Sequence, residues 1–334
     1  MKIIRHHYST PNDLQGAVVA IGNFDGIHRG HREVIRRTGR IAHELGAPFG
    51  VMTFEPHPSL FFNPDVAPFR LTPFRVKARL VSSLGTDVMF AQRFNRRFSQ
   101  ITADEFIDDV LVGGMQIRHI VVGHDFHFGK SRQGTPDRLR EGGKRHGFGV
   151  TIIDPVTGDG QEAFSSTLVR QYLREGKVTR AALFLGRYWE IEGRVKEGKK
   201  IGRTIGYPTA NISLGEMIRP AFGVYAVRLA IEGAGDSWIP GVASIGVRPT
   251  VEETEAEPLL EVFLFDFEGD LYGQHVRVAL VDFLRPEVKF DSLEDMTAQI
   301  AKDCENARST LAWEGMDTDW PSSPFLKVNP QNTS

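Results

Sequence analysis

The chain has 334 residues, about the length of two domains, and its 41% hydrophobic and 25% charged residues are typical of a globular protein. Lys and Arg number 40 and Asp and Glu number 42, so the net charge of −2 excludes a broadly basic nucleic-acid-binding protein and an acidic tail. The one cysteine, Cys304, excludes an internal disulfide, and no apolar run approaches the roughly 18 residues of a membrane span, so we expect a cytoplasmic protein.

The first half of the chain alternates strand-like and helix-like segments. Apolar runs predict strands at 17–22, 49–54, 86–91, 118–123 and 148–153. After the first of these, apolar residues recur at helical spacing from Gly30 to Leu45, and Gly46 follows as a stop signal. This alternation predicts an α/β domain over residues 1–185, with a doubly wound, Rossmann-like parallel sheet. Ligands of such sheets bind beyond the carboxyl ends of the strands.

The second half changes to strands without intervening helices. Strand patterns cover 188–195, 222–231, 239–247, 259–267 and 275–283, with Gly-, Pro- and Asp-rich breaks between them. We therefore predict an antiparallel β-barrel over residues 186–312, closed by a helix at 292–311 whose N-cap is Ser292. Residues 313–334 contain several Pro, Ser and Asn residues, so we expect a loosely ordered tail there.

The most specific local signal is the decapeptide GNFDGIHRGH at 22–31, which follows a predicted strand and runs into a predicted helix. Backbone N–H groups at a helix start attract anions, and His28 and His31 can donate to phosphate oxygens from one side. This suits nucleotidyl transfer, where charge builds on the α-phosphate and the departing pyrophosphate. The predicted ATP- or phosphate-binding residues here are Gly22, Asn23, Phe24, Asp25, Gly26 and Gly30. The alternative, a glycine turn with two surface histidines, is disfavoured by the strand–turn–helix context.

Three further segments follow predicted strand ends, where a doubly wound sheet gathers its site. They are TFEPHP at 53–58, GHDFHFG at 123–129 and SSTLVR at 165–170. The hydroxyls of Ser165, Ser166 and Thr167 can cap a helix and hold phosphate, and Arg170 can pair with phosphate charge. Taken singly, each segment is better explained as a proline loop, an aromatic turn or a Ser/Thr cap.

In the second half, glycines at 198, 202 and 206 precede the tetrapeptide PTAN at 208–211. By themselves these glycines favour a flexible hairpin loop over a phosphate site. Glu261 stands in the alternating apolar strand LEVFLFDF at 260–267. An inward-pointing carboxylate there suits a general base or acid, and an exposed strand face is an equally good alternative from the pattern alone.

Together these segments closely resemble the bifunctional bacterial riboflavin kinase/FAD synthetase family over about residues 15–312. The first half resembles its FMN adenylyltransferase module through GNFDGIHRGH, TFEPHP, GHDFHFG and FSSTLVR. The second half resembles its riboflavin kinase module through GRVKEGKKIGRTIGYPTAN, FGVY, SIGVRPT, LEVFLFDFEGDLYG and KFDSLEDMTAQI. Any one of these motifs is weak evidence, but their shared order along the chain is specific.

The resemblance implies two reactions. Riboflavin and ATP give FMN and ADP, and FMN and ATP then give FAD and pyrophosphate. Riboflavin, FMN and ATP are therefore the implied small-molecule partners, and Mg²⁺ is the implied metal. We expect neither a nucleic-acid nor a membrane partner. The family can form homo-oligomers, but no coiled-coil pattern in this chain indicates one.

The resemblance also implies residue roles. His28 and His31 match histidines that stabilise the phosphate charge during adenylyl transfer, and Glu261 matches a general base that takes the proton of the ribityl 5′-hydroxyl. The implied metal residues are Thr209 and Asn211, for Mg²⁺. The implied phosphate and ATP residues further along are Ser165, Ser166, Thr167, Arg170, Gly202 and Gly206. The implied flavin residues are Asn63, Asp125 and Phe126.

This chain departs from the family pattern near the flavin side of the kinase. Ser244 begins an SIG tripeptide where NIG is more usual, and Phe263 stands where His is common. Residues 251–253, VEE, replace an aromatic and glycines. These departures affect the expected flavin affinity and leave the implied metal and base residues intact.

Three rival interpretations explain less of the chain. Another H-x-G-H nucleotidyltransferase, acting on pantetheine phosphate or nicotinamide mononucleotide, leaves the second half unused. A class I aminoacyl-tRNA synthetase requires a KMSKS-like loop, which is absent, and the net charge of −2 disfavours broad RNA contact. A flavin-sensing regulator without turnover is disfavoured by the presence of Thr209, Asn211 and Glu261.

Overall fold

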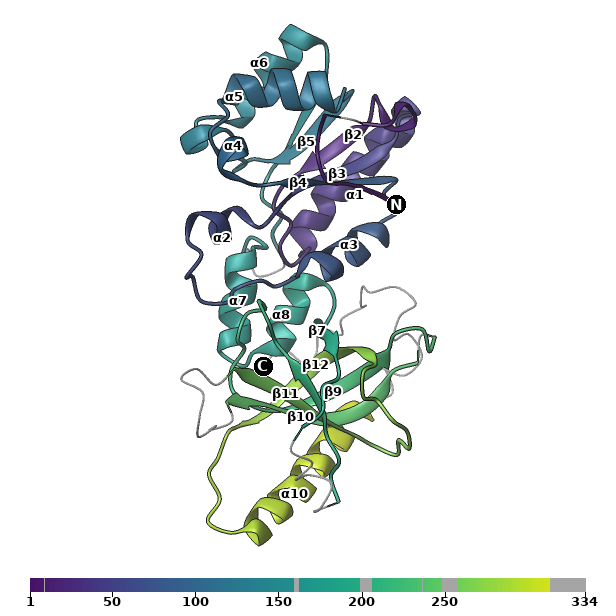
Figure 1. The fold of residues 1–334 in the computed structure, drawn as a ribbon, viewed down its shortest axis with the longest axis vertical. Coiled ribbons are helices and arrows are strands. Elements are labelled where there is room, and N and C mark those ends of the chain that lie inside the picture. Colours follow the sequence, from purple (N-terminus) through teal and green to yellow (C-terminus); the bar gives the residue numbers. More distant parts are fainter. Residues whose placement is uncertain (9, 159–161, 199–205, 236, 248–256, 313–334) are drawn as a thin grey trace. The chain divides into compact units, whose positions relative to one another are not determined.

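The computed structural model describes residues 1–312 except residues 9, 159–161, 199–205, 236 and 248–256. They form two compact units (Figure 1). The first comprises Met1–Ala67 and Thr72–Ser165, and the second comprises Pro68–Leu71 and the described part of Ser166–Ser334. The predicted tail at 313–334 lies outside the described residues.

The first unit contains a six-stranded sheet in which every neighbouring pair is parallel. Its strand order is β1 (Lys2–Ile4), β4 (Val88–Arg93), β3 (Phe49–Glu55), β2 (Val18–Ile21), β5 (His119–Gly123) and β6 (Gly149–Ile153). The five strands predicted for the first half are confirmed as β2 to β6. The edge strand β1 was not predicted, because three residues are too few to show an apolar period.

Helices cover both faces of this sheet, as predicted. Successive residues of a strand point to opposite faces, so Val18 and Ala20 enter one core while Val19 and Ile21 enter the other. The first core packs against α1 (Arg29–Leu45) and α3 (Phe74–Ser82). The second packs against a π-helix (Phe106–Gly114) and α6 (Pro136–His146). The remaining helices of the unit are short: α2 (Pro58–Phe62), α4 (Arg96–Ser99), α5 (Ala103–Glu105) and two 3₁₀ turns, η1 (Asn12–Leu14) and η3 (Lys130–Arg132).

The second unit contains a six-stranded antiparallel sheet that nearly closes into a barrel. Its order is β7 (Trp189–Arg194), β12 (His275–Pro286), β9 (Gly223–Ile231), β10 (Ile239–Val247), β11 (Pro258–Leu264) and β8 (Ala210–Ser213). The two edges meet where the N–H of Lys196 donates to the carbonyl of Asn211 at 2.9 Å. The predicted barrel is thus confirmed, and β8 is a strand that the sequence pattern did not predict.

The closing helix is also confirmed, as α10 (Leu293–Leu311). The backbone N–H of Asp295 donates to the Ser292 hydroxyl at 3.0 Å, so Ser292 is the N-cap that the sequence predicted. Ala307 and Leu311 of α10 pack with Val224 and Val242 of the sheet. This helix covers one face of β9, β10 and β12.

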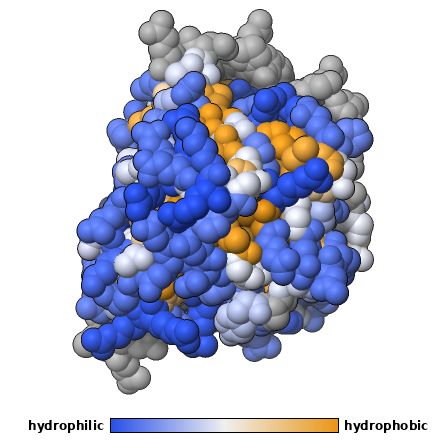
Figure 2. Space-filling model, turned by 90° about the horizontal axis from the view of Figure 1, so that it is seen from above, coloured by the Kyte–Doolittle hydropathy of each residue, from blue (hydrophilic) through white to orange (hydrophobic). Residues whose placement is uncertain are grey.

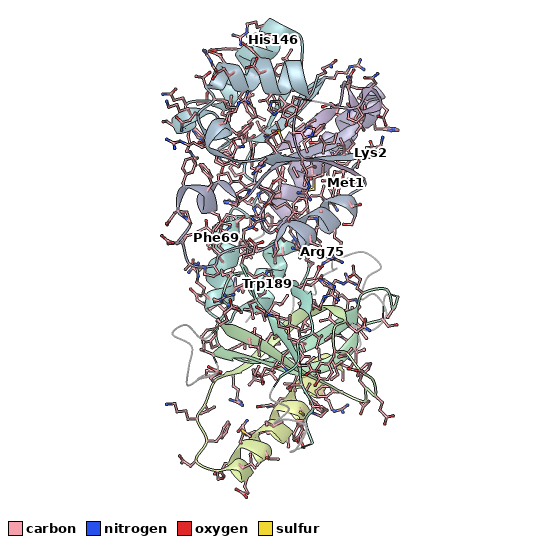
Figure 3. All side chains as sticks on the ribbon, viewed as in Figure 1. Met1, Lys2, Phe69, Arg75, His146 and Trp189 are labelled. Carbon is pink, nitrogen blue, oxygen red and sulfur yellow. The ribbon has the colours of Figure 1, made fainter. Side chains whose placement is uncertain are left out.

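Two helices that precede the barrel belong to the second unit by their contacts, α7 (Ser166–Arg174) and α8 (Val178–Leu185). The short segment Pro68–Leu71 joins the same unit, because the indole N–H of Trp189 donates to the Leu71 carbonyl at 2.9 Å (Figure 3). The compact units therefore divide before residue 166, whereas the boundary predicted between the two activities, 185/186, stays a prediction.

The face of the molecule seen from above is mainly hydrophilic. Viewed from above, charged and polar residues surround a band of apolar side chains (Figure 2). Within the described part of the chain, no helix is both long and apolar enough to cross a membrane.

Candidate active sites

The turn between β2 and α1 has an irregular backbone. Phe24 and Ile27 have φ values of 47° and 45°, in the left-handed region that bulky and β-branched residues rarely adopt. Such residues cost about 1–3 kcal/mol each and persist only where the surroundings hold them. Both side chains are buried, with 2% and 0% exposure. The shape of this turn is therefore imposed by its environment and not by local preference.

Thr72 holds one side of this turn. Asp25 Oδ1 accepts hydrogen bonds from the Thr72 N–H at 2.9 Å and from the Thr72 hydroxyl at 3.1 Å. The same hydroxyl oxygen accepts from the N–H of Gly26 at 2.8 Å. Asp25 was predicted to bind ATP or phosphate, and the contacts described here are with the protein's own backbone and hydroxyl.

Lys77 holds the other side of the turn. Its side chain is fully buried, and its Nζ donates to the Asn23 carbonyl at 2.9 Å, to Thr53 Oγ1 at 3.1 Å and to Glu55 Oε1 at 3.1 Å. Thr53 Oγ1 in turn donates to the Asn23 carbonyl at 3.1 Å. The sequence does not indicate this group, because a lysine within a helix usually lies on the surface.

His28 and His31 lie together at the N-terminus of α1. His28 is the N-cap, with Nδ1 accepting from the His31 N–H at 3.3 Å, and the two rings stack at 3.6 Å. Since Nδ1 accepts, neutral His28 carries its proton on Nε2 and can donate it to an anion. The Phe24 ring contacts the His31 ring edge-on at 5.3 Å. The predicted pairing of the two histidines is thus present in the structure.

Gly30 is the residue that permits this stack. A Cβ on Gly30 would lie 3.2 Å from the His28 ring and 3.4 Å from the Phe164 carbonyl. Phe164 directly precedes Ser165, the last residue of the first unit. The helix N-terminus adds a partial positive charge to this place. Arg32, the residue after His31, is buried. Burial, together with the nearby charges of Arg36 and Arg29, lowers the pKa of Arg32 to about 10.

The other predicted residues of the first unit follow strand ends, as expected. Asn63 is the C-cap of α2, which follows β3. Asp125 is exposed in the turn after β5, and its carbonyl oxygen accepts from His127 Nδ1 at 2.8 Å. The neighbouring Phe126 stacks on Phe128 at 5.6 Å.

Three residues predicted at the same phosphate site lie on α7 of the second unit: Ser166, Thr167 and Arg170. Arg170 Nε donates to the Phe69 carbonyl at 2.9 Å, and its guanidinium lies over the Phe69 ring at 5.3 Å. The grouping of these three residues with His28 stays a prediction.

An aromatic cluster lies beyond the ends of β3 and β4 and was not singled out from the sequence. Phe61 and Phe62 of α2 contact Phe94 at 5.3 and 5.7 Å, and Phe94 contacts Phe54 and Phe98 at 6.1 and 5.9 Å. The side chain of Phe62 is 66% exposed. The signal in the sequence was a pair of phenylalanines directly after a proline loop, where polar residues are usual. This cluster offers an aromatic ligand an apolar surface with exposed ring edges and faces.

In the second unit, sheet register brings Asn211 and Glu261 together. Asn211 of β8 is directly opposite Glu261 of β11, and Glu261 is directly opposite Ser244 of β10. Directly opposite residues of antiparallel strands point to the same face, so these three side chains form a row. The sequence left open whether the Glu261 side chain points inward or lies on an exposed strand face. In the structure Glu261 is half-buried, which is intermediate between these two expectations.

The residues predicted to hold Mg²⁺ have suitable chemistry for it. Asn211 is 4% exposed, and its Nδ2 donates to the Thr209 carbonyl at 3.4 Å. A Cβ on Gly198 would collide with the side-chain amide of Asn211, so a glycine is needed at position 198. A hydroxyl and an amide oxygen are hard ligands, and Mg²⁺ needs few protein ligands beside waters and phosphates. Gly206 has a φ of 86° in the preceding turn, and Gly202 lies outside the described residues.

Phe263, one of the departures from the family pattern, belongs to an apolar wall beside this row. Its ring contacts Tyr207 at 5.1 Å and Phe265 at 6.0 Å. Phe263 lies two residues after Glu261 and shares its face of β11, where it packs with the core under α10. The departure at 251–253 lies outside the described residues.

Comparison with known proteins matches the two halves of the chain to two families. Residues 10–168 match the FAD synthetase family, and residues 185–311 match the riboflavin kinase family. A bifunctional riboflavin kinase/FMN adenylyltransferase of Escherichia coli K12 is 42% identical over 309 residues, covering 92% of this chain and 97% of that protein. The chain belongs to the bifunctional riboflavin kinase/FMN adenylyltransferase family.

Further relatives span the whole chain in the same way. A Pseudomonas fluorescens member of this bifunctional riboflavin kinase/FMN adenylyltransferase family is 42% identical over 312 residues, covering 93% of this chain and 98% of that protein. A solved structure named as a macrolide-efflux protein from Streptococcus pneumoniae matches with a TM-score of 0.80 and 32% identity, over 93% of this chain and 99% of that one. The chain is thus an enzyme with two activities, which phosphorylates riboflavin to FMN with ATP and adenylylates FMN to FAD with ATP.

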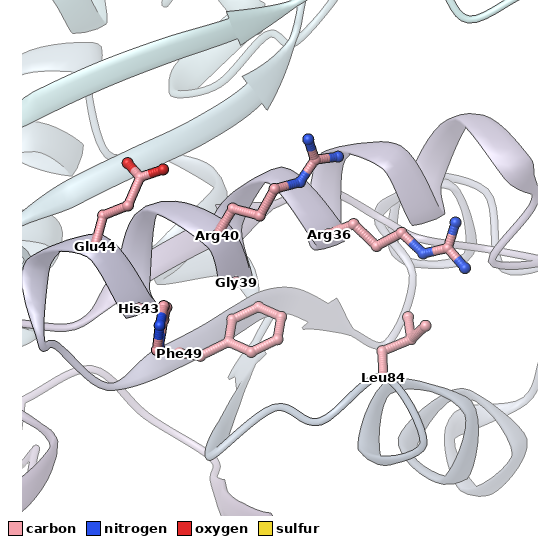
Figure 4. Close-up of a pocket in the computed structure, with 7 residues that line it drawn as sticks. All are labelled: Arg36, Gly39, Arg40, His43, Glu44, Phe49 and Leu84. Carbon is pink, nitrogen blue, oxygen red and sulfur yellow. The ribbon is translucent and has the colours of Figure 1, made fainter.

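A surface hollow of about 450 Å³ lies apart from the predicted residues (Figure 4). It is lined by the later turns of α1, including Arg36, Arg40 and His43, and by Phe49 at the start of β3. It therefore lies at the amino end of β3, whereas the histidine pair lies at the opposite end of α1. Among the described residues, no group of three or more His, Cys, Asp or Glu side chains is arranged to hold a metal ion.

Proposed function

We propose that residues 1–185 carry FMN adenylylation and residues 186–312 carry riboflavin phosphorylation. The observation that carries this assignment is that the histidine pair and the Asn211–Glu261 pair lie in different compact units. The ranges that match the two families, 10–168 and 185–311, support the same division. We also propose a cytoplasmic location, supported by the need for ATP and by the single thiol, Cys304.

In the adenylylation step, His28 and His31 stabilise the charge of the reacting phosphates. The FMN phosphate oxygen attacks the α-phosphorus of ATP, and the bond from that phosphorus to the departing pyrophosphate breaks. The attacking group is already an oxyanion, so no base is required, and positioning with electrostatic stabilisation supplies the catalysis. The Nε2–H of His28 and the start of α1 both favour an anion here.

The phosphates bind at the turn after β2, which is shaped by Gly22, Asn23, Phe24, Asp25, Gly26 and Gly30. Further phosphate contacts come from the chain that follows β6, namely from Ser165, Ser166, Thr167 and Arg170. Asn63, Asp125 and Phe126 contact the flavin. The aromatic cluster around Phe62 and Phe94 supports a flavin site that includes the end of β3, because an isoalloxazine ring is planar and largely apolar.

In the phosphorylation step, Glu261 is the general base. It takes the proton of the ribityl 5′-hydroxyl, whose oxygen attacks the γ-phosphorus of ATP, and ADP leaves. A hydroxyl is a poor nucleophile, so a positioned carboxylate accelerates this step. Thr209 and Asn211 hold Mg²⁺, which neutralises phosphate charge when bound. Gly202 and Gly206 belong to the loop on the ATP side.

The proposal is tested by supplying riboflavin, ATP and Mg²⁺ to the full chain and following FMN and FAD by chromatography, beside a reaction that starts from FMN. Asn211→Ala is then titrated with Mg²⁺. We expect the Mg²⁺ concentration for half-maximal phosphorylation to rise about tenfold or more, with no such rise for adenylylation. An equal rise in both reactions, or in neither, would contradict the Mg²⁺ assignment.

A further inference from the structure

Lys77 is an unusual residue for a helix that faces a sheet. Lysine is almost never fully buried unless its charge is paired, yet the Lys77 side chain has 0% exposure. Its Nζ reaches three oxygens, at 2.9 to 3.1 Å, which come from the turn after β2 and from β3. One ammonium group on α3 therefore connects this turn to the strand beside it.

Lys77 and Thr72 bind the turn on either side of Phe24. Asn23, whose carbonyl Lys77 holds, directly precedes Phe24, and Asp25, which Thr72 holds, directly follows it. Phe24 is one of the two residues held in the left-handed region. The strained residue is thus anchored on both sides, by side chains that lie about 50 positions later in the sequence.

The anchored residue supports the histidine pair. The Phe24 ring contacts the His31 ring edge-on at 5.3 Å, and the His31 ring stacks on the His28 ring at 3.6 Å. A continuous series of contacts therefore leads from Lys77 through Asn23 and Phe24 to the two imidazoles.

We propose that Lys77 is a positioning residue for FMN adenylylation, which sets the placement of His31 and His28 by fixing the Asn23 carbonyl. Lys77 is buried and does not contact substrate. The inference rests on the proposed role of the two histidines. When the ammonium is removed, the Asn23 carbonyl keeps Thr53 but loses its charged donor, and the backbone at Phe24 can relax toward an ordinary conformation.

Because the chain carries two activities, riboflavin phosphorylation serves as an internal control. We expect Lys77→Met to lower kcat for adenylylation about 10²-fold, the loss typical of misplaced catalytic groups, with the KM for FMN and the phosphorylation rate nearly unchanged. Arg75→Met is the matched control, because it removes a cation from an exposed position of the same helix (Figure 3). It should leave both activities unchanged.

A double-mutant cycle separates positioning from loss of structure. If Lys77 acts through His31, then Lys77→Met introduced into His31→Ala lowers adenylylation by no more than about twofold further. If Lys77→Met costs the same factor in both backgrounds, the positioning role is wrong. Should Lys77→Met lose its near-ultraviolet circular dichroism, Thr53→Val replaces it in the cycle, because that variant removes the other donor to Asn23 and keeps the Lys77–Glu55 pair.

The outcomes also separate this inference from the proposed site. If His31→Ala leaves adenylylation intact, the proposed site itself is wrong. If His31→Ala lowers adenylylation about 10²-fold while Lys77→Met and Thr53→Val leave it unchanged, the site stands and only the role of Lys77 is overturned.

Discussion

The two candidate sites are built in different ways. In the first unit the histidine pair depends on an irregular turn, whose left-handed residues are held by Thr72 and Lys77. In the second unit Asn211 and Glu261 are neighbours because β8 and β11 pair in one register. One site is therefore held by side chains and the other by a backbone ladder.

This difference has a consequence for how each site responds to substitution. Ladder hydrogen bonds join backbone atoms, so replacing one side chain in the row should leave its neighbours in place. A strained turn persists only while its anchors remain, so changes outside the site should reach the histidines. We therefore expect phosphorylation to be impaired mainly by substitutions within its own site. Adenylylation should be impaired both by substitutions within its site and by substitutions of the residues that anchor the turn.

The largest effect is expected for Glu261→Gln. Removing a general base costs about 10²–10⁴-fold, so we expect phosphorylation to fall by about 10³-fold. FMN should still be converted to FAD at the original rate, because the turn in the first unit is untouched. Chromatography of reactions started from riboflavin and from FMN measures both. A parallel loss of both activities in a folded variant would refute the two-site comparison.

A somewhat smaller effect is expected for His31→Ala. Loss of one donor to developing charge costs about 10²–10³-fold, and we expect about 10²-fold for adenylylation with phosphorylation unchanged. His43→Ala is the matched control on the same helix, since His43 lines the hollow at the other end of α1. Equal effects of the two variants would show that the loss comes from the helix and not from the site.

Asp303→Asn should affect stability and tests how α10 is held to the barrel. Arg285 forms a bidentate pair with Asp303, at 2.7 to 3.1 Å, and Gln299 donates to the same carboxylate at 2.8 Å. The Asp303 side chain is only 4% exposed, so we expect a loss of about 2 kcal/mol in urea unfolding. Asp266→Asn, which removes the exposed partner of Arg308 on the same helix, should give no measurable change.

The smallest effect is expected for Ser292→Ala, which removes the N-cap of α10. Caps of this kind contribute about 1 kcal/mol, and the loss should appear as a lower midpoint in the same unfolding measurement. Ser309→Ala lies within the same helix, where its hydroxyl bonds the Glu305 carbonyl. It should be neutral or slightly stabilising, because alanine is the better helix former. A similar loss for both would exclude a cap-specific effect.

Much of the architecture was predictable from the sequence. The strands β2 to β6 and the barrel strands β7 and β9 to β12 coincide with apolar runs in the sequence. Burial on one or both faces of a strand requires apolar residues at a regular spacing, and this spacing is visible in the sequence. The histidine pair was predictable for a related reason, because a strand, a glycine turn and a helix start are encoded by adjacent residues. Capping by Ser292 is likewise local.

The strand β8 shows what the sequence could not reveal. Its four residues show no clear alternation of apolar and polar side chains. They form a strand because their backbone groups pair with β11 on one side and with Lys196 on the other. The pairing of Asn211 with Glu261 therefore depends on residues separated by 50 positions. Thr72 is a similar case, because its hydroxyl acquires a role only when the chain folds back on Asp25.

The sequence by itself determined the parallel α/β half, the antiparallel barrel and the order of most elements, because these depend on short-range patterns. Tertiary structure alone decided that Lys77 is buried against the turn, that Phe24 is held in a left-handed conformation and that Glu261 faces Asn211. The physical reason is that burial, strain and strand register arise from contacts between segments that are distant in the sequence. A short stretch of sequence does not show which distant segment it will contact.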